Sequence, residues 1–283
     1  MIGAYQDGLD VSHPDVTTPE EIAAYRAQYA ATNKGLLDSF EFWLEFRPDV
    51  LKRHKARTAH FTAAVTPLVQ ILAAIHRYTI AGFRDGVAYE IRLAQSLGAT
   101  RADILDTLSV AFIHAGHPGM YAAAAYAGPL REYEDPPASD RFPSSWSFDP
   151  DAFRSGMDLT TREATEEDMR RLRRWYLDTI GEVPRHVDFL ARHRPGLLKA
   201  YRDRYEHAIR DSLPKQMLPY LLLNHHVVRG SRDAIRENVL LGAAVGMSRD
   251  ELLDAICFAV LHAGANALDL ADEAAGDLLA TID

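Results

Sequence analysis

Two stretches of the chain decide its fold: GFRDGVAYEIRLAQSLGATRADILDTLSVAFIHAG, residues 82–116, and GSRDAIRENVLLGAAVGMSRDELLDAICFAVLHAG, residues 230–264. At a fixed offset of 148 residues, 12 of the 35 aligned positions are identical, and both stretches close with His-Ala-Gly. Self-similarity at one period indicates a structural unit that is repeated along the chain.

The similarity continues upstream at an offset of 147, with a single one-residue slip between the two registers. The matching pairs there include Phe42/Phe189, Arg47-Pro48/Arg194-Pro195, Leu51-Lys52/Leu198-Lys199, His60/His207 and Pro67/Pro214. We interpret the chain as two tandem units, residues 18–130 and 161–283, joined by a connector at residues 131–160. The connector is rich in Pro, Ser and Asp, and its aromatic residues lead us to expect that it lies against one of the units.

Each unit is predicted to be all-α. Period-two alternation is absent over any useful length, whereas helix start and stop signals recur. The starts are capping boxes at Thr18–Glu21, Thr100–Asp103, Thr165–Asp168 and Ser248–Glu251. Gly98 and Gly246 are expected to end helices in the left-handed conformation.

Composition excludes several classes of function. The formal charge of −9 argues against nucleic-acid binding, which needs a basic face. Cys257 is the single cysteine, so an internal disulfide is impossible and a reducing, cytoplasmic compartment is expected. The N-terminal residues show no signal peptide, and the apolar stretches are too short to cross a membrane.

The order of these features resembles the carboxymuconolactone decarboxylase and alkylhydroperoxidase D-like superfamily. The resemblance rests on Leu68–Ala125, ending SVAFIHAGHPGMYAAAA, and on Leu218–Ala275, ending CFAVLHAGANALDLADEA. It implies that the fused units mimic a dimer of single units. Since many relatives assemble from six units, it also implies a homo-oligomer, most naturally a trimer, with a dimer as the alternative.

The redox branch of that superfamily carries Cys-x-x-Cys at the start of the central helix, followed by a His. The resemblance places those positions at Phe83, Gly86 and Glu90 in one copy, and at Ser231, Ala234 and Asn238 in the other. No cysteine or histidine remains there, and the peroxidase mechanism depends on a thiolate and a resolving thiol. Dithiol peroxidase activity is therefore disfavoured, and Cys257 is expected to be a core residue.

The decarboxylase branch needs no cofactor. Its resemblance implies lyase or isomerase chemistry on a small, carboxylate-bearing metabolite, and we expect no cofactor and no metal. Such chemistry requires an anion clamp, a general acid and donors that stabilise enolate-like charge.

Histidines on apolar helices are the first catalytic candidates. His114 and His262 occupy the same repeat position, and His117 follows His114 by one turn if the helix continues through Gly116. His225 and His226 precede a turn, so one of them should point toward the central helix. Each could instead be a buried histidine bonded to a backbone carbonyl. Our catalytic candidates are Glu90, His114, His117, His262, His225 and His226.

Arginines at the starts of the central helices are the candidate carboxylate clamp. Arg84 and Arg232 are identical in the two copies and lie where free N–H groups and the helix dipole favour anions. A structural ion pair with Asp85 or Asp233 is the competing interpretation. The remaining substrate-binding candidates are Tyr78, Tyr89 and His76, and Tyr121 is a further possible wall residue.

The copies differ at key positions, with Glu90 facing Asn238 in the alignment and His117 facing Ala265. We grouped Glu90 with His114 and His117, and His262 with His225 or His226. One active site, or a composite site, is therefore expected. The alternatives are a non-catalytic ligand-binding or scaffold protein and a metal-dependent oxidase or hydrolase built on the histidines.

Overall fold

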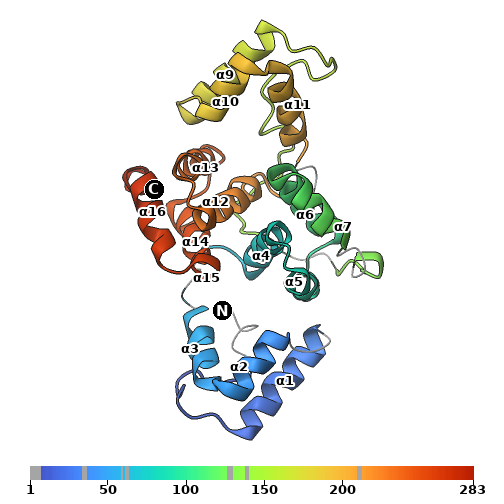
Figure 1. Ribbon diagram of the computed structural model, residues 1–283, viewed down its shortest axis with the longest axis vertical. Helices are drawn as coiled ribbons and strands as arrows, with labels where there is room; N and C mark the ends of the chain where they lie inside the picture. The colour runs from blue at the N-terminus through green and yellow to red at the C-terminus, as the bar shows by residue number, and fades with distance from the viewer. Residues whose placement is uncertain are drawn as a thin grey trace.

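The structure is a computed structural model that describes residues 8–33, 37–58, 60, 64–125, 130–137, 140–208 and 212–283. Within these ranges the regular elements are helices and no strand occurs, which confirms the all-α prediction (Figure 1).

Fifteen helices are described, in three groups. The first group is α1 (Pro19–Asn33), α2 (Asp38–Phe46) and α3 (Pro48–Thr58); the second is α9 (Glu166–Ile180), α10 (Arg185–His193) and α11 (Pro195–Glu206). The central body contains α4 (Pro67–Ala81), α5 (Arg84–Ser96), α6 (Arg101–Ala115), α7 (His117–Ala125), α12 (Met217–Arg229), α13 (Arg232–Ala244), α14 (Arg249–Phe258), α15 (Val260–Ala263) and α16 (Asn266–Leu279). Figure 1 shows α1–α3 at one end of the molecule, α9–α11 at the other, and the central body between them.

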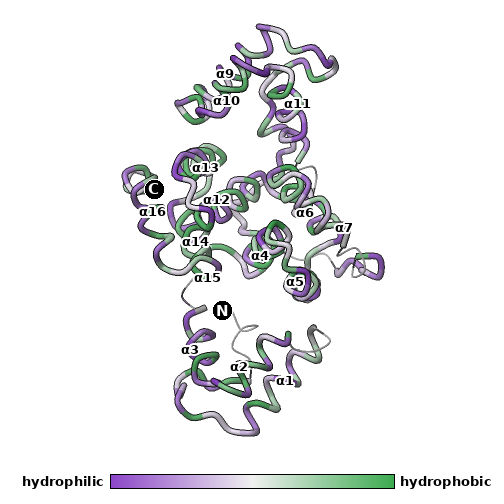
Figure 2. Tube along the Cα trace, in the orientation of Figure 1, coloured by the Kyte–Doolittle hydropathy of each residue, from purple (hydrophilic) through white to green (hydrophobic). Residues whose placement is uncertain are grey.

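The hydrophobic core lies where α4 and α12 pack against each other. Ile71, Leu72 and Ile75 of α4 are fully buried, as are Tyr220 and Leu221 of α12. Figure 2 shows hydrophobic residues recurring along these central helices. Their burial supplies the main favourable free energy of folding.

The expected helix boundaries are present. All four capping boxes form, with the Thr or Ser side chain accepting from the third helical N–H and the acid accepting from the cap N–H. Gly98 and Gly246 have φ of 91° and 90°, which is the left-handed region that glycine tolerates best. Helices α5 and α13 begin 148 residues apart, at Arg84 and Arg232, and each has 13 residues.

Two buried lysines hold the outer helices together. Lys52 of α3 pairs with Glu21 at 2.7 Å, and Lys199 of α11 pairs with Asp168 at 2.9 Å, so each joins the capping acid of the first helix in its group. Both lysine side chains are at most 4% exposed. Since a buried charge without a partner costs several kcal/mol, each pair ties α3 to the start of α1, and α11 to the start of α9.

The connector differs from the expectation that it lies against one unit, because it contacts both. Arg141 Nη1 lies 2.5 Å from Asp103 Oδ2 at the start of α6, and Trp146 Nε1 donates to Glu251 Oε1 at the start of α14 over 2.8 Å. Trp146 is 7% exposed. Two capping acids therefore also anchor the connector.

Two aspartates at the same position of the sequence repeat, Asp106 and Asp254, join the first half of the chain to the second. Asp254 on α14 accepts from the backbone N–H groups of Ala64 and Val65 just before α4, at 2.8 and 3.0 Å. Asp106 on α6 accepts from the Ser212 hydroxyl, at 2.6 Å, in the segment before α12. Each aspartate therefore holds the approach to the core helix of the opposite half.

Candidate active site

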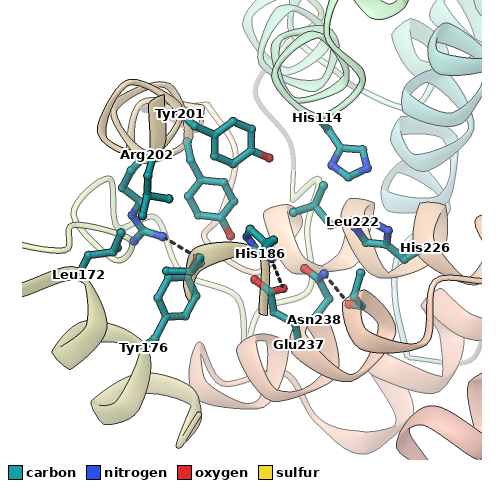
Figure 3. Close-up of a pocket in the computed structure, with 14 residues that line it drawn as sticks. His114, Leu172, Tyr176, His186, Tyr201, Arg202, Leu222, His226, Glu237 and Asn238 are labelled. Atoms are coloured by element: carbon teal, nitrogen blue, oxygen red, sulfur yellow. Dashed lines mark hydrogen bonds and ion pairs between the residues drawn. The ribbon is translucent and has the colours of Figure 1, made fainter. Parts of the chain in front are cut away.

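A cavity of about 190 Å³, here called cavity A, lies between α9–α11 and the central body (Figure 3). Its wall combines helices of both halves, because α6 contributes His114 and all other lining residues come from α9–α13. The polar lining residues are His114, Tyr176, His186, Tyr201, Arg202, Tyr205, His226, Glu237 and Asn238. The apolar lining residues are Leu172, Val187, Leu198, Leu222 and Ala234.

Glu237 is the acidic group of cavity A. Its side chain is 17% exposed, and Oε2 lies 3.8 Å from Nδ1 of the half-exposed His186. Burial raises the pKa of Glu237 to about 7, and the positive charge of Arg202 opposes this shift. A carboxyl with this pKa exchanges its proton near neutral pH, which suits a general acid or base.

Two neutral imidazoles face the same space. The rings of His114 and His226 lie 4.7 Å apart between centroids and are nearly perpendicular. Burial lowers the pKa of His114 to about 4 and that of His226 to about 3, so both rings are neutral at pH 7. A neutral imidazole has one donor and one acceptor nitrogen, so each ring can hydrogen-bond a substrate oxygen or relay a proton.

Asn238 is the residue at which the sequence resemblance places the histidine of the redox branch. Its amide Nδ2 donates to the carbonyl of Ala234 over 2.8 Å, which fixes the side chain along α13 and leaves Oδ1 as the acceptor that the amide presents (Figure 3). Asn238 is 4% exposed. The side chain therefore offers a fixed hydrogen-bonding group rather than a titratable one.

Arg202 is a structural cation in the wall rather than a free clamp. Its Nε lies 2.9 Å from Glu206 Oε1, and its guanidinium stacks 4.0 Å from the centroid of Trp175. Its Nη2 also donates to the carbonyl of Phe153. These partners occupy Nε and Nη2 of the guanidinium group. The remaining nitrogen, Nη1, lies 3.4 Å from the Tyr176 hydroxyl and makes only a weak hydrogen bond to it.

A second cavity of about 110 Å³, cavity B, lies between α2–α3 and the central body. It brings together Glu90 and Tyr89 of α5, Tyr78 of α4, Lys55 of α3 and His262 of α15. The rings of His262 and Tyr78 lie 5.1 Å apart, and burial lowers the pKa of His262 to about 4. Burial and the nearby charge of Glu90 raise the pKa of Tyr78.

The structure groups the candidate catalytic residues differently from the sequence-based expectation. Glu90 lies with His262 rather than with His114, and His114 lies with His226 and Asn238. The physical reason is the packing of the histidine-bearing helix ends: α6 packs against α11 of the other half, where Arg204 lies over Phe112 at 4.7 Å. Each cavity is thus lined by residues from both halves of the chain.

His117 does not join the site. Helix α6 ends at Ala115, Gly116 has a φ of 67°, and α7 begins at His117. The condition for placing His114 and His117 on one face is therefore not met. His117 is exposed and its ring lies 6.0 Å from that of Tyr121, which is 67% exposed.

The two candidate clamp arginines also lie outside both cavities. Arg84 and Arg232 are exposed in the first turns of α5 and α13, and neither lines cavity A or cavity B. Arg232 forms an ion pair with Glu273 of α16 rather than with Asp233. The structure therefore does not bring these two arginines together with the residues that line either cavity.

His76 and His225 pack behind His114. The rings of His114 and His225 lie 4.7 Å apart, and the fully buried His76 lies 5.9 Å from His225. Burial, and then the neighbouring histidines, lower the pKa of both His76 and His225. Neither residue lines cavity A or cavity B, although the sequence had placed His76 with the substrate and His225 among the catalytic residues.

Metal and thiol chemistry gain no support from this arrangement. Across the part of the chain that the structure describes, no group of three or more His, Cys, Asp or Glu side chains is placed to hold a metal ion. Cys257 is half-buried on α14, and burial raises the pKa of its thiol. A search of the described residues also finds no helix long and apolar enough to cross a membrane.

Glu237 is the group that the sequence analysis missed. The resemblance to the redox branch pointed to Asn238, where that branch has a histidine, and not to the preceding residue, Glu237. A signal was nevertheless present, because Ala234, Glu237 and Leu241 recur at helical spacing and Leu241 is 3% exposed. An acid at that spacing beside a buried position is a candidate for a raised pKa.

Comparison with known proteins identifies the fold. No family model matches the sequence, and no curated protein matches it. Among solved structures, the chain is similar to a protein of Burkholderia xenovorans LB400 described as a candidate gamma-carboxymuconolactone decarboxylase subunit. The TM-score is 0.55 over 97% of this chain and 99% of that chain, at 13% sequence identity. The carboxymuconolactone decarboxylase-like fold expected from the sequence is thereby confirmed; at this identity the likeness concerns the fold alone.

Proposed function

We propose that the protein is a cofactor-independent lyase or isomerase that acts in cavity A on a small, carboxylate-bearing metabolite. The observation that carries the proposal is the burial of Glu237, with a pKa near 7, in the cavity that the neutral rings of His114 and His226 also line. A proton donor or acceptor poised at neutral pH in a small cavity suits proton-transfer chemistry at carbon.

If the protein acts as a lyase, the proposed reaction is a decarboxylation. The bond between the substrate carbon and its carboxylate breaks, carbon dioxide leaves, and the electron pair remains on an enolate-like carbon–oxygen system. Imidazole N–H groups of His114 or His226 donate to the developing oxyanion, and protonated Glu237 delivers a proton to carbon. For an isomerase, ionised Glu237 removes a proton from one carbon and returns it to another.

Cavity B is proposed as an unequal counterpart. Glu90 and His262 lie in it as Glu237 and His114 lie in cavity A, and Lys55 replaces Arg202 as the buried cation. Cavity B is the smaller, at about 110 Å³ against about 190 Å³. We therefore assign turnover to cavity A, and we interpret the pair of cavities as a product of the tandem duplication inferred from the sequence.

Assembly into a homo-oligomer belongs to the same proposal. Phe42 and Phe46 on α2 are 52% and 59% exposed, and Phe189 on α10 is 56% exposed. Exposed aromatic side chains that gather on one helix are typical of protein–protein contacts. They support self-association of this chain, as a trimer or a dimer, in the reducing compartment that the single cysteine suggests.

The test is a panel of small cyclic and unsaturated carboxylic acids followed by ¹H NMR in D₂O, which detects both decarboxylation and proton exchange at carbon. The wild-type chain is expected to turn over at least one acid. Glu237→Gln is expected to lower turnover about 100-fold or more, while Glu90→Gln, the matched change in cavity B, leaves most of it.

A second candidate function is ligand binding without catalysis, which the absence of turnover in the panel would favour. Binding of an acid by the wild-type chain, with no product or exchange, contradicts the lyase proposal and supports the binding protein. Loss of activity in Glu90→Gln but not in Glu237→Gln would move the site to cavity B.

A further inference from the structure

An open cleft of about 760 Å³, here called the arginine cleft, shares His114 and His226 with cavity A as lining residues. It is lined by Arg77, His114, His225, His226, Arg229 and Ser231, together with small apolar residues. Arg77 lies just before the last turn of α4, Arg229 is the last residue of α12, and Ser231 is the N-cap of α13. The two halves of the chain therefore build this cleft together.

The cleft is cationic in a chain whose formal charge is −9. None of its lining residues in the described part of the chain carries a carboxylate. Among the described residues, Nε of Arg77 is buried without a hydrogen-bond partner, and burial and then the positive charge of Arg229 lower the pKa of Arg77. Two guanidinium groups held near each other without a counter-charge repel, and an anion between them removes that cost.

Further donors point the same way. His225 is 5% exposed and lines the cleft, and its Nδ1 finds no hydrogen-bond partner among the described residues. Ser231 starts α13 without capping it through its side chain, so its hydroxyl and the first N–H groups of the helix remain donors. The nearby Asp233 is turned to Arg185, at 3.6 Å. An oxyanion can accept from all of these groups.

We infer that the arginine cleft binds the oxyanion of a small molecule, a carboxylate or phosphate group, between Arg77 and Arg229. The site is separate from cavity A and shares only the wall formed by His114 and His226. It does not require that cavity A catalyses a reaction. The guanidinium fork can bind two oxygens of one anion at once, which lysine cannot do.

Isothermal titration calorimetry with inorganic phosphate and with malonate, at constant ionic strength and pH 7.5, tests the inference. The wild-type chain is expected to bind one of them with a dissociation constant of about 1 mM or tighter. Arg229→Gln, at an exposed position, should weaken binding at least about 10-fold, and Arg77→Lys should weaken it through loss of the fork. Arg84→Gln is the matched control, since Arg84 is exposed and does not line the cleft, and it should bind as wild type does.

Three results would overturn the inference: no binding of either anion up to about 10 mM, equal affinity in wild type and Arg229→Gln, or equal weakening in Arg84→Gln. The relative affinities of phosphate and malonate tell the two anion sources apart. The two proposals can fail separately. If neither anion binds the cleft but Glu237→Gln loses turnover, the anion-binding proposal is refuted and the proposed function of cavity A stands.

Discussion

Glu237→Gln should become more stable relative to wild type as the pH rises from acid to alkaline. Burial raises the pKa of Glu237 from 4.5 to about 7, so the folded state binds a proton that the unfolded chain has already released between these values. Folding stability from this group is therefore fully present below pH 4.5 and is lost as the pH rises to 7. Gln, which cannot ionise, removes that loss.

The magnitude follows from linkage between the two pKa values. Between pH 5.5 and pH 8, the wild-type chain loses about 2 kcal/mol of stability through Glu237, at about 1.4 kcal/mol per pH unit over the part of the range where the two states differ. The stability difference between Glu237→Gln and wild type should grow in favour of the variant by that amount. Comparing the two proteins cancels the titration of the histidines.

Urea unfolding at pH 5.5 and at pH 8, followed by circular dichroism, measures this difference. Glu45→Gln, which removes an exposed carboxyl on α2, provides the baseline. If the advantage of Glu237→Gln over wild type changes with pH no more than that of Glu45→Gln, then Glu237 is not held protonated by its surroundings and the acid–base assignment loses its physical basis.

Three other perturbations test separate parts of the account. Arg202→Met leaves Glu206 buried without its cation, so it should destabilise the protein by about 3–5 kcal/mol in thermal or urea unfolding. The control Arg171→Met removes an exposed ion pair and should cost at most about 1 kcal/mol. His114→Gln should reduce the stability loss between pH 7 and pH 5 by about 2 kcal/mol, because the folded state holds His114 neutral while the unfolded chain protonates below 6.5; an unchanged pH dependence would show that the ring is not desolvated. Phe42→Ser with Phe46→Ser should lower the mass measured by light scattering after gel filtration if α2 forms the self-association contact, and an unchanged oligomer would exclude that surface.

Local signals predicted the helices well. Thr100 with Asp103, and Ser248 with Glu251, mark helix starts through hydrogen bonds that span three residues, so neighbouring sequence contains all the necessary information. The same holds for Gly98 and Gly246, where a positive φ requires a residue without Cβ. By contrast, the repeat could not show that the connector anchors to both halves, because Arg141 and Trp146 bind partners far away in sequence.

The sequence singled out several residues that line the two cavities, but it did not predict how the structure groups them. His114, His226, Glu90 and His262 all line cavities, yet the sequence paired Glu90 with His114, because it cannot tell which half a helix end packs against. His117 lines neither cavity because the backbone turns at Gly116, between α6 and α7. Glu237 became a candidate only through its burial, which depends on α9–α11 covering α13, and that contact is tertiary.

The most direct test of the account is the pH dependence of kcat/KM, in wild type and Glu237→Gln, for an acid that the wild-type chain turns over. The account predicts that the wild-type profile bends near pH 7, the pKa of Glu237 in its buried position, and that Glu237→Gln is slower by about 100-fold or more and lacks this bend. A wild-type profile that is flat through pH 7, or a Glu237→Gln profile that matches it in shape and height, would contradict acid–base catalysis by Glu237 in cavity A.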